Sequence, residues 1–494
     1  MHHNKPSHLF PILGTILLLS CAAVGSQSVP EKAKKKASPI EEAKSRRDAM
    51  EFFKKAEAMI GTPGENSEEQ ADLFRKAIQA KPDFLEAHYN LGLVYANQKK
   101  MPEASAELEA VLKIEPEFDA GIYMLLATTY QGSGDSKAAI AALEEGLRRE
   151  PKSSKFLRAL AYLQFNNKND AAAIQNLLRL LDMEPNDASI HMDLALLYQR
   201  NNDLEKAEEH FQDILRQDPA NYEAHYNLAI LYSRQKRSAD AAAEFETANK
   251  IRPGDADLLE RLGDAYAFQS QHAKAVAAYK AALQNTGDQG SILAKLGFSL
   301  ANLNRIEEAV GALERAEKLN DKSADIPFLL GDLYSELKRF DDAIAAYTKS
   351  IQINPKQKEV HYNLGTLFAE QNRLDDARTE LKIAVDLDPD YAAAWSNIAL
   401  VAEKLERDAE AIQAHEKVIA LGKAQALNFF HLGILYAKSS QVNPAIAAFA
   451  RAIEMEPDKY RAILREELKK VHSILDPVRY KEGFTKLLNS TPAH

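Results

Sequence analysis

The side chains best suited to chemistry in this sequence are its thirteen histidines and its one cysteine. Four of the histidines, His88, His191, His225 and His361, each stand fourth in a recurring segment of 34 residues. That place lies on an apolar helical face, where a packed or hydrogen-bonded histidine is far more common than a metal ligand. We therefore interpret these histidines as structural.

Segments that carry known catalytic or ligand-binding chemistry are missing from the sequence. No H-E-x-x-H zinc segment, phosphate-binding P-loop or G-x-S-x-G nucleophile segment occurs. Asp255-Ala256-Asp257 fails as a calcium loop because Leu259 holds the next ligand position. The sequence predicts no catalytic residue, no metal ligand and no cofactor.

Cys21 is the only cysteine, so neither an intrachain disulfide nor a cysteine-based zinc site can form. It follows the apolar run Leu9 to Leu19, which suits a signal-peptide core and is shorter than the ~18 residues that span a bilayer. Leu18-Leu19-Ser20-Cys21 resembles the lipobox of bacterial lipoproteins, although Ala, Ser or Thr is more usual where Leu19 stands.

This resemblance implies that residues 1–20 are a signal peptide and that Cys21 carries diacylglycerol. Ala22, rather than Asp, follows the cysteine, which by lipoprotein sorting implies the outer membrane, facing the periplasm. The alternative is an ordinary cleaved signal with a chance cysteine. Residues 21–48 have no apolar period and predict a flexible basic tether. Its lysines are either solvated, which we favour, or held against anionic headgroups.

The overall composition is that of a folded, mildly acidic protein. The 494 residues include 46% hydrophobic and 27% charged side chains, with 62 Lys and Arg against 72 Asp and Glu. The net charge of −10 leaves no broad positive field for a nucleic-acid backbone. Nucleic acid is therefore not an expected partner.

Most of the chain repeats with a period of 34 residues. Prolines recur at this spacing, beginning with Pro82, Pro116 and Pro151, and residues 85–459 divide into eleven units with one inserted residue. Counting Leu85 as position 1, position 8 is always Gly or Ala and position 20 is always Ala. Apolar residues at positions 4, 7, 8 and 11 mark one helical face, and those at 20, 24 and 27 mark a second helix.

Small residues at positions 8 and 20 let two helix backbones approach closely, and the proline ends the second helix. This pattern resembles the tetratricopeptide repeat (TPR), with Trp395 in its tryptophan position. The resemblance implies an all-α superhelix of about twelve helix-turn-helix repeats. Residues 49–84 are then a divergent first repeat, and residues 460–494 are C-terminal capping helices.

In such arrays, positions 2, 5, 6, 9, 12 and 13 of the first helix line a concave groove. Here positions 5 and 6 carry tyrosines and asparagines similar to the asparagine ladder of peptide-binding arrays. These candidate groove residues are Tyr89, Asn90, Tyr226, Asn227, Tyr362, Asn363 and Asn397. A carboxamide can pair with an extended peptide backbone, and a tyrosine adds apolar contact area. The alternative is that these residue types are simply common at these positions.

The groove positions also hold four cations, Arg200, Arg234, Arg261 and Lys295, which could form a patch for an acidic partner. Asp257 lies nearby, and a solvated face with local charge pairing is the interpretation that we favour.

Two classes of function fit these observations. The first is a non-catalytic scaffold, tethered to a cell-envelope membrane, that binds extended segments of partner proteins during envelope assembly or secretion. The second is the substrate-recruiting arm of an enzyme such as a glycosyltransferase. No stretch outside the repeats approaches the ~100 residues of a catalytic domain, which favours the scaffold.

Overall fold

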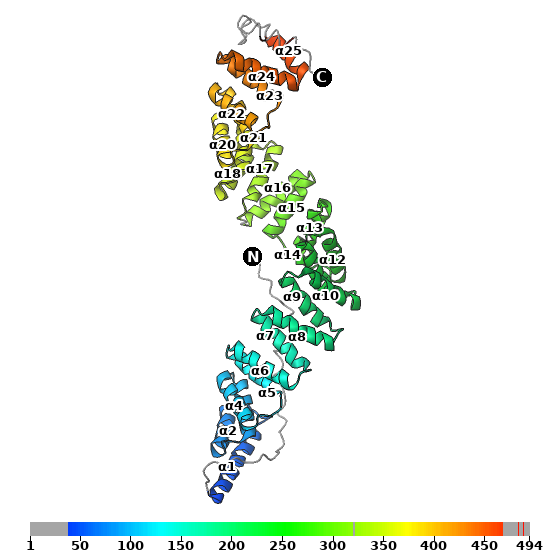
Figure 1. Cartoon of the computed structure of the whole chain (residues 1–494), viewed down its shortest axis with the longest axis vertical. Helices are drawn as coiled ribbons and strands as arrows, with labels where there is room; N and C mark the ends of the chain where they lie inside the picture. The colour runs from blue at the N-terminus through cyan, green and yellow to red at the C-terminus, as the bar shows by residue number, and fades with distance from the viewer. Residues whose placement is uncertain (1–37, 320–321, 468–482, 484–487, 489–494) are drawn as a thin grey trace. The chain divides into compact units, whose positions relative to one another are not determined.

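The computed structural model describes residues 38–319 and 322–467, together with residues 483 and 488 (Figure 1). These residues form α-helices joined by short turns and contain no strand, which confirms the all-α prediction. Cys21 and the rest of residues 1–37 lie outside the described residues, as does most of the predicted C-terminal cap. Among the described helices, none has the length and apolar character that crossing a bilayer requires.

The chain divides into two compact units, Met1–Gln235 and Lys236–His494. The described helices of the first unit are α1 (Pro39–Glu57), α2 (Glu68–Ala80), α3 (Leu85–Asn97), α4 (Met101–Ile114), α5 (Ile122–Gly132), α6 (Ser136–Arg149), α7 (Ser154–Asn166), α8 (Asp170–Met183), α9 (Ala188–Arg200), α10 (Leu204–Gln217) and α11 (Tyr222–Arg234).

The described helices of the second unit are α12 (Ser238–Ile251), α13 (Ala256–Phe268), α14 (His272–Thr286), α15 (Gly290–Asn302), α16 (Ile306–Lys318), α17 (Asp325–Glu336), α18 (Phe340–Ile353), α19 (Lys358–Glu370), α20 (Leu374–Leu387), α21 (Ala392–Lys404), α22 (Asp408–Ala420), α23 (Ala426–Lys438), α24 (Val442–Met455) and α25 (Pro457–Glu467).

Within each unit, consecutive helices pack as antiparallel hairpins, and each hairpin packs on the next. In the eleven repeats from residue 85 onward, the residue at position 15 has a left-handed backbone conformation, for example Lys99 with φ 61° and Asn304 with φ 57°. Repetition of one turn geometry gives the hairpins within each unit the same helix pairing. The first helix of a hairpin is called helix A below and the second helix B.

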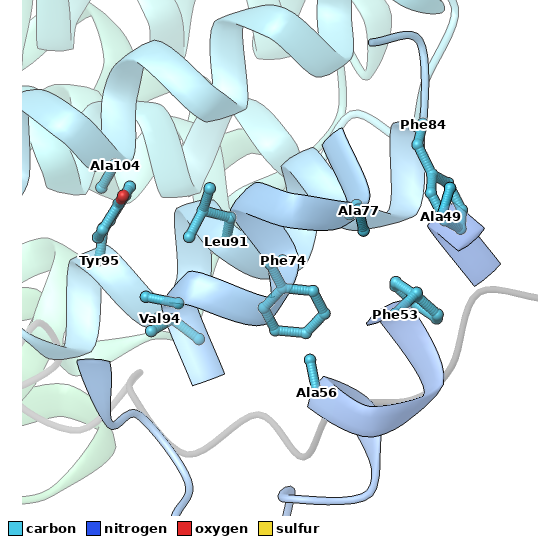
Figure 2. Close-up of a cluster of buried hydrophobic side chains, with 12 residues drawn as sticks. Ala49, Phe53, Ala56, Phe74, Ala77, Phe84, Leu91, Val94, Tyr95 and Ala104 are labelled. Carbon is cyan, nitrogen blue, oxygen red and sulfur yellow. The ribbon is translucent and has the colours of Figure 1, made fainter. Parts of the chain in front are cut away.

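Small residues at the helix crossings are buried as the sequence predicts. Alanine at position 20 is 0% exposed in every repeat, as at Ala104 and Ala275. Glycine at position 8 lies under a large helix B side chain: a Cβ on Gly263 would lie 2.4 Å from Cε1 of Tyr279. Figure 2 shows the first part of this core, where Leu91, Phe74 and Phe53 come from successive helices.

The N-terminal hairpin starts earlier than the sequence analysis expects. Helix α1 begins at Pro39 rather than near Ala49, so residues 39–48, assigned above to the tether, are helical. The reason is a capping box, in which the Ser38 amide donates to Oε2 of Glu41 (3.0 Å) and Ser38 Oγ accepts from the Glu41 amide (3.3 Å). The side chain of Gln70, which replaces the usual alanine, is buried and donates to the Ala56 carbonyl at 2.9 Å.

The C-terminal cap also starts earlier than expected. Helix α25 begins at Pro457, directly after α24, and not at Tyr460. Tyr460 and Leu464 are 0% exposed and pack with Phe430 and Phe449 of the last repeat. Most of the predicted cap beyond residue 467 lies outside the described residues.

Candidate functional site

The helices A of the second unit form a continuous row. Helix α13 contacts α15, α15 contacts α17, α17 contacts α19, and α19 contacts α21. We call the side chains at positions 2, 5, 6, 9, 12 and 13 of these five helices the A-helix face. It holds three of the groove residues that the sequence analysis names, Tyr362, Asn363 and Asn397.

An aromatic pair lies beside this face, where Tyr362 of α19 contacts Tyr391, the residue directly before α21. The rings of Tyr362 and Tyr391 lie 5.0 Å apart between centroids. Nζ of Lys358 lies 5.3 Å from the centre of the Tyr391 ring and donates to Asp388 at 2.6 Å. Burial and neighbouring acidic groups raise the pKa of Tyr391 to about 12, so its hydroxyl stays protonated near neutral pH.

The side-chain amides of the two asparagines in adjacent repeats already form hydrogen bonds within the chain. Nδ2 of Asn363 donates to Oδ1 of Asp332 at 2.8 Å, and Nδ2 of Asn397 donates to Oγ1 of Thr366 at 2.9 Å. In both cases position 6 of one repeat bonds to position 9 of the repeat before it. These bonds tie successive helices A together.

Asp332 connects this link to the interior of its repeat. Its Oδ1 also accepts from the Tyr347 hydroxyl at 2.6 Å. Burial raises the pKa of Asp332, against the effect of its hydrogen bonds with Tyr347 and Asn363. The Asn363 link is therefore continuous with the helix A–helix B packing.

Lys295 also connects two successive helices A, but through ion pairs rather than a neutral hydrogen bond. Its Nζ donates to Oε1 of Glu260 and to Oδ2 of Asp264, each at 2.7 Å. Burial favours the neutral amine, but the hydrogen bonds to Asp264 and Glu260 outweigh it and raise the pKa of Lys295. Lys295 therefore serves as a tie between helices A, with its charge matched inside the chain.

The other three cations of the suggested acidic-partner patch also have partners. Arg200 pairs with Asp170, its guanidinium 4.0 Å from the ring centre of Phe165. Arg261 donates to Asp257 at 2.8 Å, and Arg234 donates to the Gln199 carbonyl at 3.2 Å. Arg200 and Arg261 therefore pair locally with carboxylates, whereas the partner of Arg234 is a neutral carbonyl.

The groove residues of the first unit are placed differently. Asn90 and Asn227 donate to backbone carbonyls one turn earlier in their own helices, Glu86 O at 2.7 Å and Glu223 O at 2.8 Å. The Tyr89 ring packs against Phe118 at 5.5 Å, and the Tyr226 ring stacks on Tyr222 at 5.9 Å.

The sequence analysis missed the exposed apolar side chains of the A-helix face. Phe268 at position 13 is 83% exposed, Phe298 at position 9 is 52% exposed and Leu400 at position 9 is 39% exposed. Phe298 has one ring contact, with His272 at 6.2 Å. Large apolar residues at groove positions are the signal that could have found them. They provide the apolar contact that a binding surface needs.

The histidines at position 4 are buried and hydrogen-bonded, as predicted. Nε2 of each lies 3.0–3.1 Å from a proline carbonyl six residues earlier, for example His88 with Pro82 and His361 with Pro355. Trp395 uses its Nε1 in the same way, donating to Pro389 O at 2.9 Å. Position 4 therefore closes the turn between repeats.

Two groups of histidines and carboxylates come together that sequence spacing did not suggest. One is His191 with His210 and Asp213, and the other is Glu403 with His415 and His431. The residues of the first group occupy positions 4, 23 and 26 of one repeat, so comparing repeats at these positions could have found it.

A cavity of about 700 Å³ lies between α22, α23 and α24. Its walls are mostly apolar and include Phe429, Leu432, Tyr436 and Met455, with Arg451 among the lining residues.

Comparison with known proteins agrees with the repeat pattern. Three sequence models, all described as "Tetratricopeptide repeat", match the chain. One matches residues 124–188, 192–256 and 295–358, the second residues 71–128 and 334–403, and the third residues 256–288. Together they span most of the chain between residues 71 and 403. No curated protein sequence matches the chain.

Several solved structures resemble parts of the chain. One, described as YrrB, "a TPR protein with an unusual peptide-binding site", is 23% identical, covers 40% of this chain and 100% of its own, and has a TM-score of 0.36. MamA is 22% identical over 33% of this chain and 95% of its own, with a TM-score of 0.32. The C-terminal part of a TPR repeat-containing protein from Cytophaga hutchinsonii is 17% identical, covers 48% of this chain and 98% of its own, and has a TM-score of 0.43.

Proposed function

Because the chain belongs to the tetratricopeptide repeat family, we propose that it is a non-catalytic scaffold that binds extended segments of partner proteins on the A-helix face. The observation that carries this proposal is the set of exposed apolar side chains Phe268, Phe298 and Leu400 along one row of helices. An extended peptide presents both apolar side chains and backbone N–H and C=O groups that lack partners. A face that combines exposed apolar side chains with polar ones can contact both.

The polar side chains of the same face could form hydrogen bonds of fixed orientation with a bound segment. Asn363 and Asn397 are held in place by bonds to the preceding repeats, so their carboxamides are fixed in orientation. A fixed polar group loses little conformational freedom on binding, which favours affinity. The Tyr362 and Tyr391 rings add apolar area beside them.

Because Arg261 and Lys295 of this face already pair with carboxylates of the chain, we expect affinity to depend more on apolar contact than on charge. Raising the salt concentration screens exposed charge and leaves apolar contact in place. We therefore expect only a shallow decrease of binding with salt.

The experiment begins with random unstructured peptides displayed on phage and selected on the protein. The selected peptide is then measured against Phe298→Glu on the A-helix face and Ile353→Glu on helix B α18. Phe298 is 52% exposed and Ile353 is 42% exposed, so the two substitutions remove a similar amount of buried apolar surface. We therefore expect them to affect the stability of the fold to a similar extent.

Fully burying one exposed large apolar side chain contributes about 1.5–3 kcal/mol, and about half of that remains for Phe298, which is 52% exposed, so Phe298→Glu should weaken binding by about 4- to 10-fold. Ile353→Glu should bind as the unchanged protein does. Equal binding by the two variants would remove the A-helix face from the proposal.

We further propose that the scaffold is held at the bacterial cell envelope through a lipid on Cys21, probed by fractionation below. The support is the lipobox-like Leu18-Leu19-Ser20-Cys21 after a short apolar run. One acyl chain alone holds a protein marginally, whereas two or more anchor it stably. A role in envelope assembly or secretion would follow from that location.

A further inference from the structure

One repeat of the first unit differs from the other repeats that have histidine at position 4 in the residue that stands at position 23. Where position 4 is histidine, position 23 is glutamate in three repeats, as in His88 with Glu107 and His361 with Glu380. In both of these pairs, Nδ1 of the histidine lies 2.6 Å from a glutamate oxygen. In the repeat that begins at Ala188, position 23 is His210 instead.

The departure brings the Nδ1 atoms of two imidazoles together, with the ring planes tilted by 53°. Nδ1 of His191 lies 3.0 Å from Nδ1 of His210, and Oδ2 of Asp213 lies 3.6 Å from Nδ1 of His191. The three donor atoms all lie within 4.8 Å of one another. Asp213 is three residues after His210 on α10, and His191 is on α9, so the cluster joins the two helices of one hairpin.

We propose that His191, His210 and Asp213 form a binding site for a divalent transition-metal ion such as zinc or cobalt. Two imidazoles and one carboxylate are ligands that such ions favour. With metal–nitrogen bonds of 2.0–2.1 Å, tetrahedral ligands lie about 3.3 Å apart. The observed 3.0 and 3.6 Å separations lie on either side of that value.

The surroundings orient the ligands as metal sites require. Nε2 of His191 donates to the Pro185 carbonyl at 3.1 Å, which leaves the lone pair of Nδ1 directed at the cluster. The His210 ring stacks on Tyr198, with centroids 5.6 Å apart and planes 7° apart. The other oxygen of Asp213 pairs with Arg216, so Oδ2 faces the histidines.

Charge also favours an ion at this place. Burial and the nearby His191 lower the pKa of His210 to about 4, and the Asp213 carboxylate lies beside the two rings. At most one hydrogen can lie between the two Nδ1 atoms, and a divalent ion would replace it. Three protein ligands leave a fourth position for water.

The second cluster is chemically different. Glu403 accepts from His415 Nε2 at 2.8 Å through Oε1 and from His431 Nδ1 at 2.7 Å through Oε2. Each ring nitrogen that faces the carboxylate therefore already has its own acceptor. A metal there would have to displace both hydrogens, so this cluster serves as the rival site in the experiment.

The experiment titrates the full chain, without a polyhistidine tag, with Co²⁺ and follows the visible absorption of the bound ion. Its main variant is His210→Glu with Asp213→Ala. This change copies Glu107 and Ala110 of the repeat that begins at Leu85. It is expected to fold because that repeat already uses the His–Glu pair, and circular dichroism checks this.

The unchanged protein should bind Co²⁺ at this site, and the main variant should lose affinity by more than the ~10–100-fold that changes in outer-shell partners cause. The reverse graft, Glu107→His with Ala110→Asp, should add one Co²⁺ per chain. No binding by the unchanged protein would overturn the proposal. So would binding that survives the main variant but is lost in His415→Ala, and so would a reverse graft that adds no site.

Discussion

The close approach of helices at position 8 can be tested with one methyl group. Gly263 lies in the interior of α13 under Tyr279, which is 1% exposed and donates its hydroxyl to Asp264 at 2.7 Å. A Cβ at residue 263 would lie 2.4, 2.6 and 2.9 Å from three atoms of the Tyr279 ring. Ordinary contact begins near 3.4 Å, so the ring must move by about 1 Å out of a packed site.

The size of the effect follows from two opposing terms. Overpacking a core costs about 1–3 kcal/mol, while replacing a helix-interior glycine with alanine gains about 0.5–1 kcal/mol. Gly263→Ala should therefore lower the free energy of unfolding by about 1 kcal/mol. Gly311 in α16 is the matched control, because it is exposed and a Cβ there would meet no atom within 4 Å.

Gly311→Ala should raise the free energy of unfolding by about 0.5–1 kcal/mol. The difference between the two variants then isolates the clash, since both gain the same helix propensity. Urea denaturation followed by circular dichroism measures both variants against the unchanged protein. If both are stabilised to the same extent, position 8 is not the close contact that the structure describes, and the packing argument fails.

Three further predictions test other parts of the structure. Asn363→Ala and Asn397→Ala should each lower the unfolding free energy by about 1 kcal/mol in urea denaturation, because each breaks a link between repeats. Burial opposes ionisation of Asp187, but bonds from Ser189 and Arg158 outweigh it and lower the pKa to about 2, below the ~3.9 of an unfolded chain. Its stabilising effect is therefore present above about pH 4 and lost as the pH falls toward 2, and Asp187→Asn should remove that part of the pH dependence of unfolding. Cys21→Ala should move the protein from the membrane to the soluble fraction, and an unchanged distribution would contradict lipid attachment.

Repetition made most of the fold predictable. Position 20 is alanine eleven times over, and each of these alanines is fully buried, because two helix backbones must meet there. The histidines at position 4 were likewise predicted correctly to be buried and hydrogen-bonded. Ser38 and Glu41 show the capping-box spacing, so the earlier start of α1 could have been read from the sequence as well.

The candidate site was less predictable, because its contacts join different repeats. The partners of Asn363 and Asn397 lie 31 residues earlier, and both are residues at position 9 that no local pattern singles out. The exposure of Phe268 and Phe298 likewise depends on which neighbouring side chains fail to cover them. Periodicity identifies which helical face a residue occupies, whereas partners and exposure depend on the packing of adjacent repeats.

Photo-crosslinking tests the central claim most directly. A selected peptide that carries a benzophenone side chain is bound to the full chain, irradiated, and the attachment points are mapped by mass spectrometry. Binding on the A-helix face predicts attachment to residues at positions 2, 5, 6, 9, 12 and 13 of α13, α15, α17, α19 and α21. Attachment instead to helices B, such as α18 near Ile353, or to the cavity between α22 and α24 would contradict the account.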